Sequence, residues 1–95
     1  MSQEILRIKK MANPIMKSFG VSKSFLFGSY ARNESKKRSD IDFLIEFGKK
    51  KSLLDLVALK IKLEKAFKKK VDLVTEDAIP FKIKKFIKKD QIKIL

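Results

Sequence analysis

The chain has 95 residues, a formal net charge of +13 and 44% apolar residues, and it contains neither cysteine nor histidine. This length predicts one domain over residues 1–95 with a modest core. The missing residue types exclude disulfides, typical zinc sites, a Ser-His-Asp triad and an imidazole base. A metal bound here must therefore be a hard cation held by carboxylate oxygens, such as Mg²⁺, Mn²⁺ or Ca²⁺.

The positive charge comes almost entirely from lysines spread along the chain. Three interpretations are open: a compositional or thermophile-like surface, an acidic protein partner, or nucleic acid. Nucleic acid is the least favoured, because bidentate phosphate and base recognition tends to use arginine, and only three arginines are present. No apolar run is long enough to span a membrane, and MSQEILRIKK lacks a signal-peptide core. A cytoplasmic protein is expected.

Hydrophobic periodicity and breaker residues predict an alternation of helices and short strands. In chain order the expected elements are a helix over 3–19, a strand over 24–27, a brief helix over 30–32, a strand over 41–47, a helix over 53–67, a strand over 71–74, a helix over 80–89, and a final strand or frayed tail over 92–95. Asn13-Pro14 is expected to kink or restart the first helix. Ser52 is expected to cap the helix over 53–67. In the last helix Ile83, Phe86 and Ile87 are expected to face inward. This order predicts an α/β (α+β) domain whose helices cover a small sheet.

Three aspartates interrupt the apolar strands. Asp40 and Asp42 are two residues apart, so they project from one face of their strand, and Asp72 lies within a later strand. Taken singly, each has an ordinary interpretation as a cap, a lysine partner or a surface residue. Together they would repel one another unless a divalent metal joined them, and carboxylates at this spacing can bridge two ions. The set therefore indicates a metal site for phosphoryl chemistry.

Gly28-Ser29 follows the strand over 24–27 and opens the next turn. Glycine lets the backbone approach a ligand closely, and N–H groups with a serine hydroxyl can hold phosphate oxygens. By itself the dipeptide is a weak signal, and an ordinary turn is the default interpretation. Its distance from the paired aspartates strengthens the phosphate interpretation.

The segment GSYARNESKKRSDIDFLIEF resembles the signature of minimal nucleotidyltransferases (MNT) in the DNA polymerase β superfamily. The shared features are a Gly-Ser turn, a ten-residue spacer, a D-x-D and a third aspartate on a later strand. The resemblance covers essentially the whole chain. It implies a small mixed β-sheet flanked by helices, and ATP or another NTP as substrate.

The resemblance also implies a role for each of these residues. Gly28-Ser29 would hold the triphosphate, and Arg32 would contact phosphate or brace the loop. Asp40 and Asp42 would bind the metal ions, expected to be two Mg²⁺ with Mn²⁺ as an alternative. Asp72 would be the third metal ligand and would help to activate the attacking hydroxyl.

Two further positions of the loop bear on the resemblance. Asn33 stands where relatives usually have glycine, and asparagine tolerates left-handed backbone better than most residues. The loop is therefore expected to keep its shape. Ser39 matches the serine that usually precedes the D-x-D, and we interpret it as bracing the loop rather than as catalytic.

MNT proteins of this size resemble the antitoxins of two-gene HEPN/MNT pairs, which adenylylate a tyrosine of the HEPN toxin. The resemblance therefore implies Mg-dependent transfer of AMP from ATP to a hydroxyl of a HEPN-type partner. Two alternatives remain open: the same chemistry on RNA or a small molecule, and an inactive module that neutralises a toxin or binds nucleic acid. The sequence leaves the nucleotide and the homo- or hetero-oligomeric state open.

Overall fold

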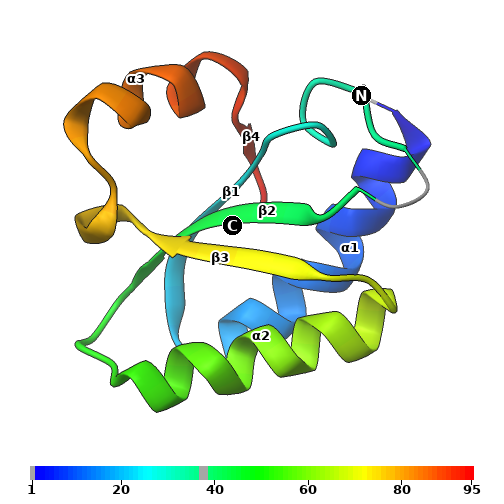
Figure 1. The fold of residues 1–95 in the computed structure, drawn as a ribbon. Helices are drawn as coiled ribbons and strands as arrows, with labels where there is room; N and C mark the ends of the chain where they lie inside the picture. Colours follow the sequence, from blue (N-terminus) through cyan, green and yellow to red (C-terminus); the bar gives the residue numbers. More distant parts are fainter. Residues whose placement is uncertain (1, 37–38) are drawn as a thin grey trace.

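The computed structural model describes residues 2–36 and 39–95. Its elements in chain order are α1 (Gln3–Ser18), β1 (Val21–Phe27), β2 (Ile41–Phe47), α2 (Leu53–Phe67), β3 (Val71–Thr75), the 3-10 helix η1 (Glu76–Ala78), α3 (Phe81–Asp90) and β4 (Ile92–Lys93) (Figure 1). Among the helices described, none combines the length and apolarity needed to cross a membrane.

The four strands form one mixed sheet in the order β3-β2-β1-β4. β1 is antiparallel to both β2 and β4, whereas β2 and β3 are parallel. A parallel pair requires a crossover connection, and α2 supplies it. The expected mixed sheet with flanking helices is thus confirmed.

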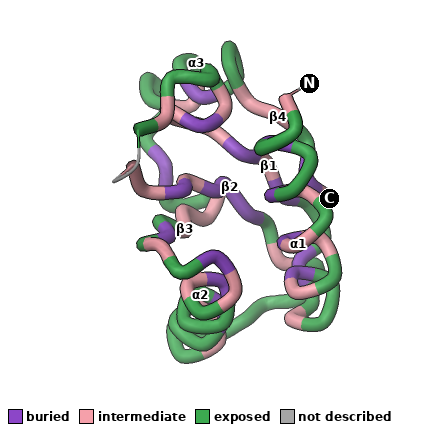
Figure 2. Tube along the Cα trace, turned by 90° about the vertical axis from the view of Figure 1, so that its right-hand side faces the viewer, coloured by how far each residue is buried: buried purple, intermediate pink, exposed green. Residues whose placement is uncertain are grey.

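Helices cover both faces of this sheet. α1 and α2 lie on one face and α3 lies on the other (Figure 1). The main core fills the space between the sheet and the first two helices, and Figure 2 shows buried residues on the segments that face this space. Its fully buried side chains include Met16, Leu26, Phe43, Leu59 and Leu63. A smaller cluster lies beneath α3.

Strand alternation decides which face of the sheet receives the carboxylates. Ile41, Phe43 and Ile45 of β2 belong to the main core, whereas Leu44 belongs to the cluster under α3. Because successive side chains of a strand point to opposite faces, Asp42 projects from the same face as Leu44. The aspartates therefore lie on the α3 side of the sheet, away from α1 and α2.

The predicted cap of α2 is confirmed. The Ser52 side chain accepts a hydrogen bond from the Asp55 N–H at 3.3 Å, and the Asp55 carboxylate accepts one from the Ser52 N–H at 2.9 Å. The Ser52 hydroxyl also donates to Asp55 Oδ2 at 3.0 Å, and the hydrogen bonds from the Ser52 N–H and hydroxyl lower the pKa of the Asp55 carboxyl. Lys68 ends the helix in a left-handed conformation with φ 55°. α2 spans the residues that the sequence predicts because both of its ends carry local stop signals.

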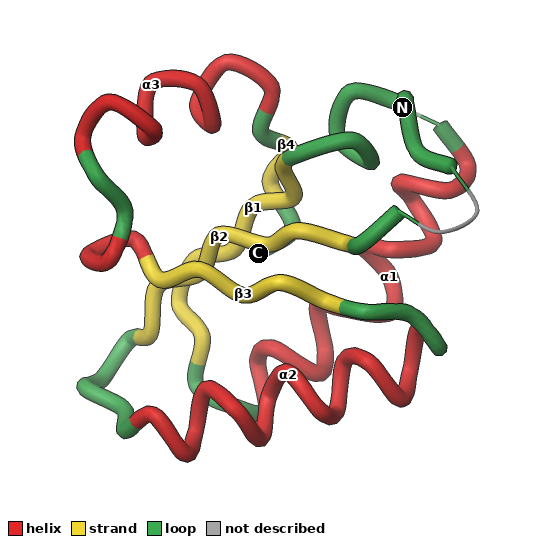
Figure 3. Tube along the Cα trace, viewed as in Figure 1, coloured by secondary structure: helices red, strands yellow, loops and turns green. Residues whose placement is uncertain are grey.

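Three local predictions were wrong. Residues 30–32 form hydrogen-bonded turns rather than a helix, with a single α-type bond from the Arg32 N–H to the Gly28 carbonyl at 3.1 Å (Figure 3). Of the two alternatives predicted at Pro14, the restart is wrong, because α1 passes through Pro14 as one helix. β1 begins at Val21, three residues earlier than expected, because pairing with β2 reaches Phe47.

The predicted inward face of α3 was also largely wrong. Of the three residues expected to face inward, only Ile87 is buried, whereas Ile83 is 50% exposed and Phe86 is 77% exposed. α3 packs on the sheet through Ile87 against Leu44 and Ile79, a narrow contact. Periodicity identifies a helix, but it does not specify how much of its apolar face a small sheet can cover.

Candidate active site

Strand pairing brings three of the predicted site residues together at the amino-terminal end of β2. Asp42 pairs with Phe27 of β1 on one side and with Asp72 of β3 on the other. Gly28 follows Phe27 directly. Residues that lie 14 and 30 positions from Asp42 in the sequence are therefore its immediate neighbours in the sheet.

Gly28 is in close contact with the Asp42 side chain. Its φ is +77°, a left-handed conformation that side chains other than glycine rarely adopt. A Cβ atom at this position would collide with Asp42 Oδ2 and lie 3.2 Å from Asp42 Cγ. The position thus requires glycine for two independent reasons, and the Gly-Ser turn is held directly against the D-x-D carboxylate.

Asp42 is strongly perturbed by its surroundings. Burial, a hydrogen bond with Asp72 and the negative charges of Asp72 and Asp40 raise the pKa of Asp42 from 3.8 to about 6. Arg32 acts in the opposite direction through its positive charge. The four charged residues predicted for the site therefore interact electrostatically, with Asp42 at the centre.

The charged residues of the site differ in their exposure to solvent. Asp40 and Asp42 are half-buried, whereas Asp72 is exposed. Arg32 is also exposed, and its Nε donates a hydrogen bond to Glu34 Oε2 at 3.3 Å. Asp72 and Arg32 are thus accessible to a ligand that approaches the α3 side of the sheet.

These residues fit a hard divalent cation. The donors are all carboxylate oxygens, and a cation between Asp42 and Asp72 would relieve the repulsion that raises the pKa of Asp42. In residues 2–36 and 39–95, no three acidic side chains converge into a complete metal cage. Mg²⁺ does not require one, because it commonly binds one or two carboxylates and completes its shell with water and substrate phosphates.

The loop after the Gly-Ser turn has the features that its sequence predicts. Asn33 has φ 59°, so it adopts the left-handed conformation, which asparagine tolerates better than most residues. The Ser39 hydroxyl accepts a hydrogen bond from the Lys36 N–H at 2.8 Å, and the Ser39 N–H donates to the Lys36 carbonyl at 2.9 Å. The interpretation of Ser39 as a brace is confirmed. Lys37 and Arg38 lie outside the described residues.

Glu64 was not among the residues predicted from the sequence. Its carboxylate, on the last turns of α2, accepts a hydrogen bond from the Val71 N–H at 3.0 Å. Val71 is fully buried and immediately precedes Asp72. A glutamate seven residues before a strand carries no sequence signal of this kind, since the bond depends on how α2 packs on β3.

We expect Glu64→Ala to destabilise the protein by about 1–3 kcal/mol, because the buried Val71 N–H loses its acceptor. Glu64→Gln keeps an acceptor oxygen, so its stability should lie close to that of the wild type. Urea unfolding of both variants checks this, with Glu46→Ala, a substitution of an exposed residue of β2, as the control. Equal stability of Glu64→Ala and the wild type would contradict the anchoring role.

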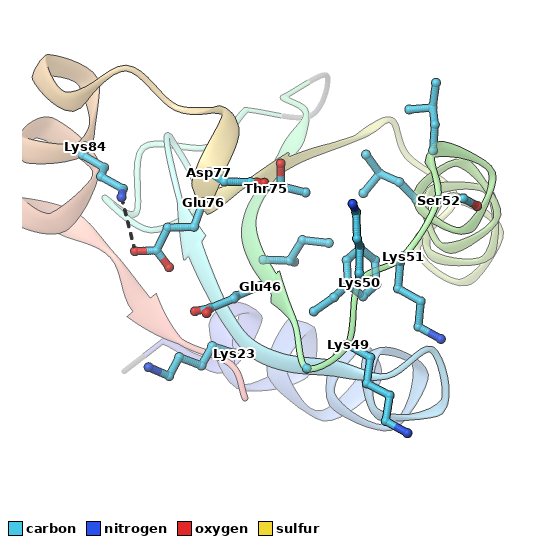
Figure 4. A pocket seen from close by; sticks show the side chains of 15 residues that line it. Lys23, Glu46, Lys49, Lys50, Lys51, Ser52, Thr75, Glu76, Asp77 and Lys84 are labelled. Carbon is cyan, nitrogen blue, oxygen red and sulfur yellow. Dashed lines mark ion pairs between the residues drawn. The ribbon is translucent and has the colours of Figure 1, made fainter.

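A hollow of about 760 Å³ lies at the opposite end of β2 (Figure 4). Its lining includes Glu46, Thr75 and the lysines of the loop before α2, and Lys84 pairs with Glu76 at 3.7 Å across one side. None of the predicted site residues lines it. The candidate active site is therefore the open surface around Asp42, not this hollow.

Comparison with known proteins identifies the family. The model of the nucleotidyltransferase domain matches residues 8–94. MJ0435 of Methanocaldococcus jannaschii, provisionally assigned as a protein adenylyltransferase, is 47% identical over 91 residues, covering 96% of this chain and 98% of that protein. The similarity thus spans both proteins almost end to end.

Two solved structures show the same fold. A protein provisionally described as a minimal nucleotidyltransferase superposes with a TM-score of 0.83 at 30% identity, covering 97% of this chain and 95% of that one. A chain from the complex of the tri-AMPylated HEPN toxin with the MNT antitoxin of Shewanella oneidensis has a TM-score of 0.75 at 17% identity, covering 95% and 71%. The second likeness concerns the fold alone. With its carboxylates paired across β2 and β3 and its Gly-Ser turn against them, the chain belongs to the nucleotidyltransferase domain family and is a minimal nucleotidyltransferase.

Proposed function

We propose that this chain transfers AMP from ATP to a hydroxyl group of a HEPN-type partner protein. The observation that carries the proposal is the contact of Gly28 with Asp42, next to the in-register pair of Asp42 and Asp72. It places a backbone that can approach phosphate beside carboxylates that can hold a metal. The complex of an AMPylated HEPN toxin with an MNT antitoxin supports the choice of nucleotide and partner.

Each residue of the site would have its own role in the proposed transfer. The Gly28-Ser29 turn would receive the triphosphate, and exposed Arg32 would contribute positive charge beside it. Asp42 and Asp72 would hold Mg²⁺ together with water and substrate phosphates, and Asp40 would add negative charge beside them; when bound, the ion neutralises phosphate charge and orients in-line attack at the α-phosphorus. The exposed Asp72 would orient the acceptor hydroxyl.

The proposed transfer conserves atoms and charge. The acceptor oxygen forms a bond to the α-phosphorus as the bond from that phosphorus to the bridging oxygen of the β-phosphate breaks. Pyrophosphate leaves, and AMP remains on the acceptor. The hydroxyl proton passes to a carboxylate, for which exposed Asp72 is the candidate, or to solvent, since the chain has no histidine.

The test is incubation with Mg²⁺ and α-labelled ATP, with and without a HEPN-type protein from the same organism. We expect label on that protein, confirmed by a mass increase of one AMP, and none when EDTA removes the metal. Label on RNA or on a metabolite instead would contradict the protein acceptor. No transfer with any of the four NTPs would contradict the activity itself.

A further inference from the structure

α2 differs from the other helices in carrying two apolar faces. Leu59, Leu63 and Phe67 are buried in the main core. Four further aliphatic side chains, which we call the α2 ridge, point away from it: Leu53 (74% exposed), Leu54 (79%), Val57 (44%) and Ile61 (48%). At 100° per residue these four positions fall within an arc of about 100°. They form one continuous stripe along the helix.

Such a stripe is unusual for a surface helix. A helix with one core-facing side normally presents polar and charged residues to water, and a helix that is apolar all round is normally covered. Single exposed apolar residues need no explanation, whereas contiguous ones mark interaction sites. α2 packs mainly against α1 and β3, with Phe67 also against Phe43 of β2, and these contacts leave the ridge uncovered.

The charges around the ridge indicate what covers it. Lys60 and Lys65 flank it on α2, and three lysines, 49–51, directly precede the helix. The two carboxylates of α2 are engaged elsewhere, because Asp55 caps the helix and Glu64 binds the Val71 N–H. The salt bridges Arg32–Glu34 and Lys84–Glu76 do not involve these flanking lysines, and of the lysines Lys51 alone has a charge that helps to lower the pKa of Asp55. The rim of the ridge is therefore positive.

A second copy of this chain fits the ridge poorly. Packing two ridges together would bring the same lysines face to face, between chains that each carry +13. Carboxylates on a partner would satisfy them instead. A straight row of side chains at i, i+4 and i+8 also packs best into the grooves of another helix. Charge and shape therefore favour an acidic helical partner over self-association.

We propose that the α2 ridge docks a helix of the HEPN-type partner, one with an apolar stripe flanked by carboxylates. The choice of partner rests on the proposed function, but the docking surface does not depend on the chemistry. The ridge belongs to the helix layer on the opposite face of the sheet from Asp42 (Figure 1). The partner is thus held by a surface separate from the catalytic one, so binding persists when transfer is blocked.

The test measures affinity for the HEPN-type protein by calorimetry, with AMP transfer assayed in parallel. We expect Leu54→Glu/Ile61→Glu to weaken binding at least tenfold while circular dichroism and Tm show a retained fold. Phe81→Glu/Phe86→Glu is the matched control, since these α3 residues are also large, apolar and exposed (73% and 77%, against 79% for Leu54 and 48% for Ile61). Lys60→Glu/Lys65→Glu should also weaken binding and reduce its salt dependence, whereas Lys88→Glu/Lys89→Glu on α3 should not.

Three outcomes would overturn the proposal. The first is wild-type affinity for the HEPN-type protein in both Leu54→Glu/Ile61→Glu and Lys60→Glu/Lys65→Glu. The second is an isolated chain that is dimeric and becomes monomeric in Leu54→Glu/Ile61→Glu, which would assign the ridge to a second copy. The third is no binding between the wild-type chain and the HEPN-type protein. By contrast, tight ridge-dependent binding without AMP transfer would support the docking surface and contradict only the proposed chemistry.

Discussion

Asp42→Asn should lower nucleotidyl transfer by about 100- to 1,000-fold, the usual effect of removing one preorganised electrostatic group. The same substitution should make the metal-free protein more stable at pH 8. Wild-type Asp42 is half-buried, hydrogen-bonded to Asp72 and near the negative charges of Asp72 and Asp40, so its ionised form is disfavoured in the folded state. The amide has no charge to desolvate, and it can still hydrogen-bond to Asp72. Loss of function and gain of stability are expected from one change.

The contribution of Asp42 to folding stability depends on pH, and the direction of this dependence follows from the shift of its pKa. The folded-state pKa of about 6 lies above the ordinary value of 3.8, so the folded state binds the proton more tightly than the unfolded state does. The stability that this group contributes is therefore present below about pH 4 and is lost as the pH rises to 6 and above. The difference in Tm between Asp42→Asn and wild type should be near zero at pH 4 and largest above pH 6.

Thermal unfolding in EDTA from pH 4 to 8 measures this difference, with Asp90→Asn at the exposed end of α3 as the control. Adding Mg²⁺ at pH 8 should raise the Tm of the wild type more than that of Asp42→Asn. An Asp42→Asn variant that is less stable than wild type at pH 8, or that retains transfer, would contradict this account of the site.

Gly28→Ala should reduce both stability and activity. Alanine in the left-handed conformation costs about 1–2 kcal/mol, and its methyl group would displace the Asp42 carboxylate with which it collides. We therefore expect a loss of about 1–3 kcal/mol of unfolding free energy, typical of a strained position, and at least a tenfold loss of transfer.

Gly48→Ala is a matched control for that experiment. A Cβ at Gly48 would meet its nearest atoms at 3.5 and 3.6 Å, which is ordinary contact, and its φ is not left-handed. Urea unfolding and the AMP-transfer assay of the two variants separate the specific effect from that of adding a methyl group. Equal behaviour of the two variants would show that the turn does not need to approach Asp42.

Much of the fold was predictable from local signals. β2 and α2 have the bounds that alternation and the Ser52 cap predict, and α1 and α3 are within a residue or so of their predicted ends. The errors occurred where local signals were weak or ambiguous. Residues 30–32 are too few to form a helix without tertiary support, and the apolar periodicity of α3 could not show that Phe86 stays exposed.

By itself the sequence determined which chemistry is available. The absence of histidine and cysteine and the order of Gly28-Ser29, Asp40, Asp42 and Asp72 indicated carboxylate–metal phosphoryl chemistry, because residue types and spacing are local properties. Only the tertiary structure decided the geometry of the site. It pairs Asp42 with Asp72, and it leaves no space for a side chain at Gly28 because Asp42 fills that space. It also brings the Glu64 carboxylate to the Val71 N–H at the start of β3. It also left the second apolar face of α2 uncovered. These features depend on contacts between segments far apart in the chain, and no local pattern specifies them.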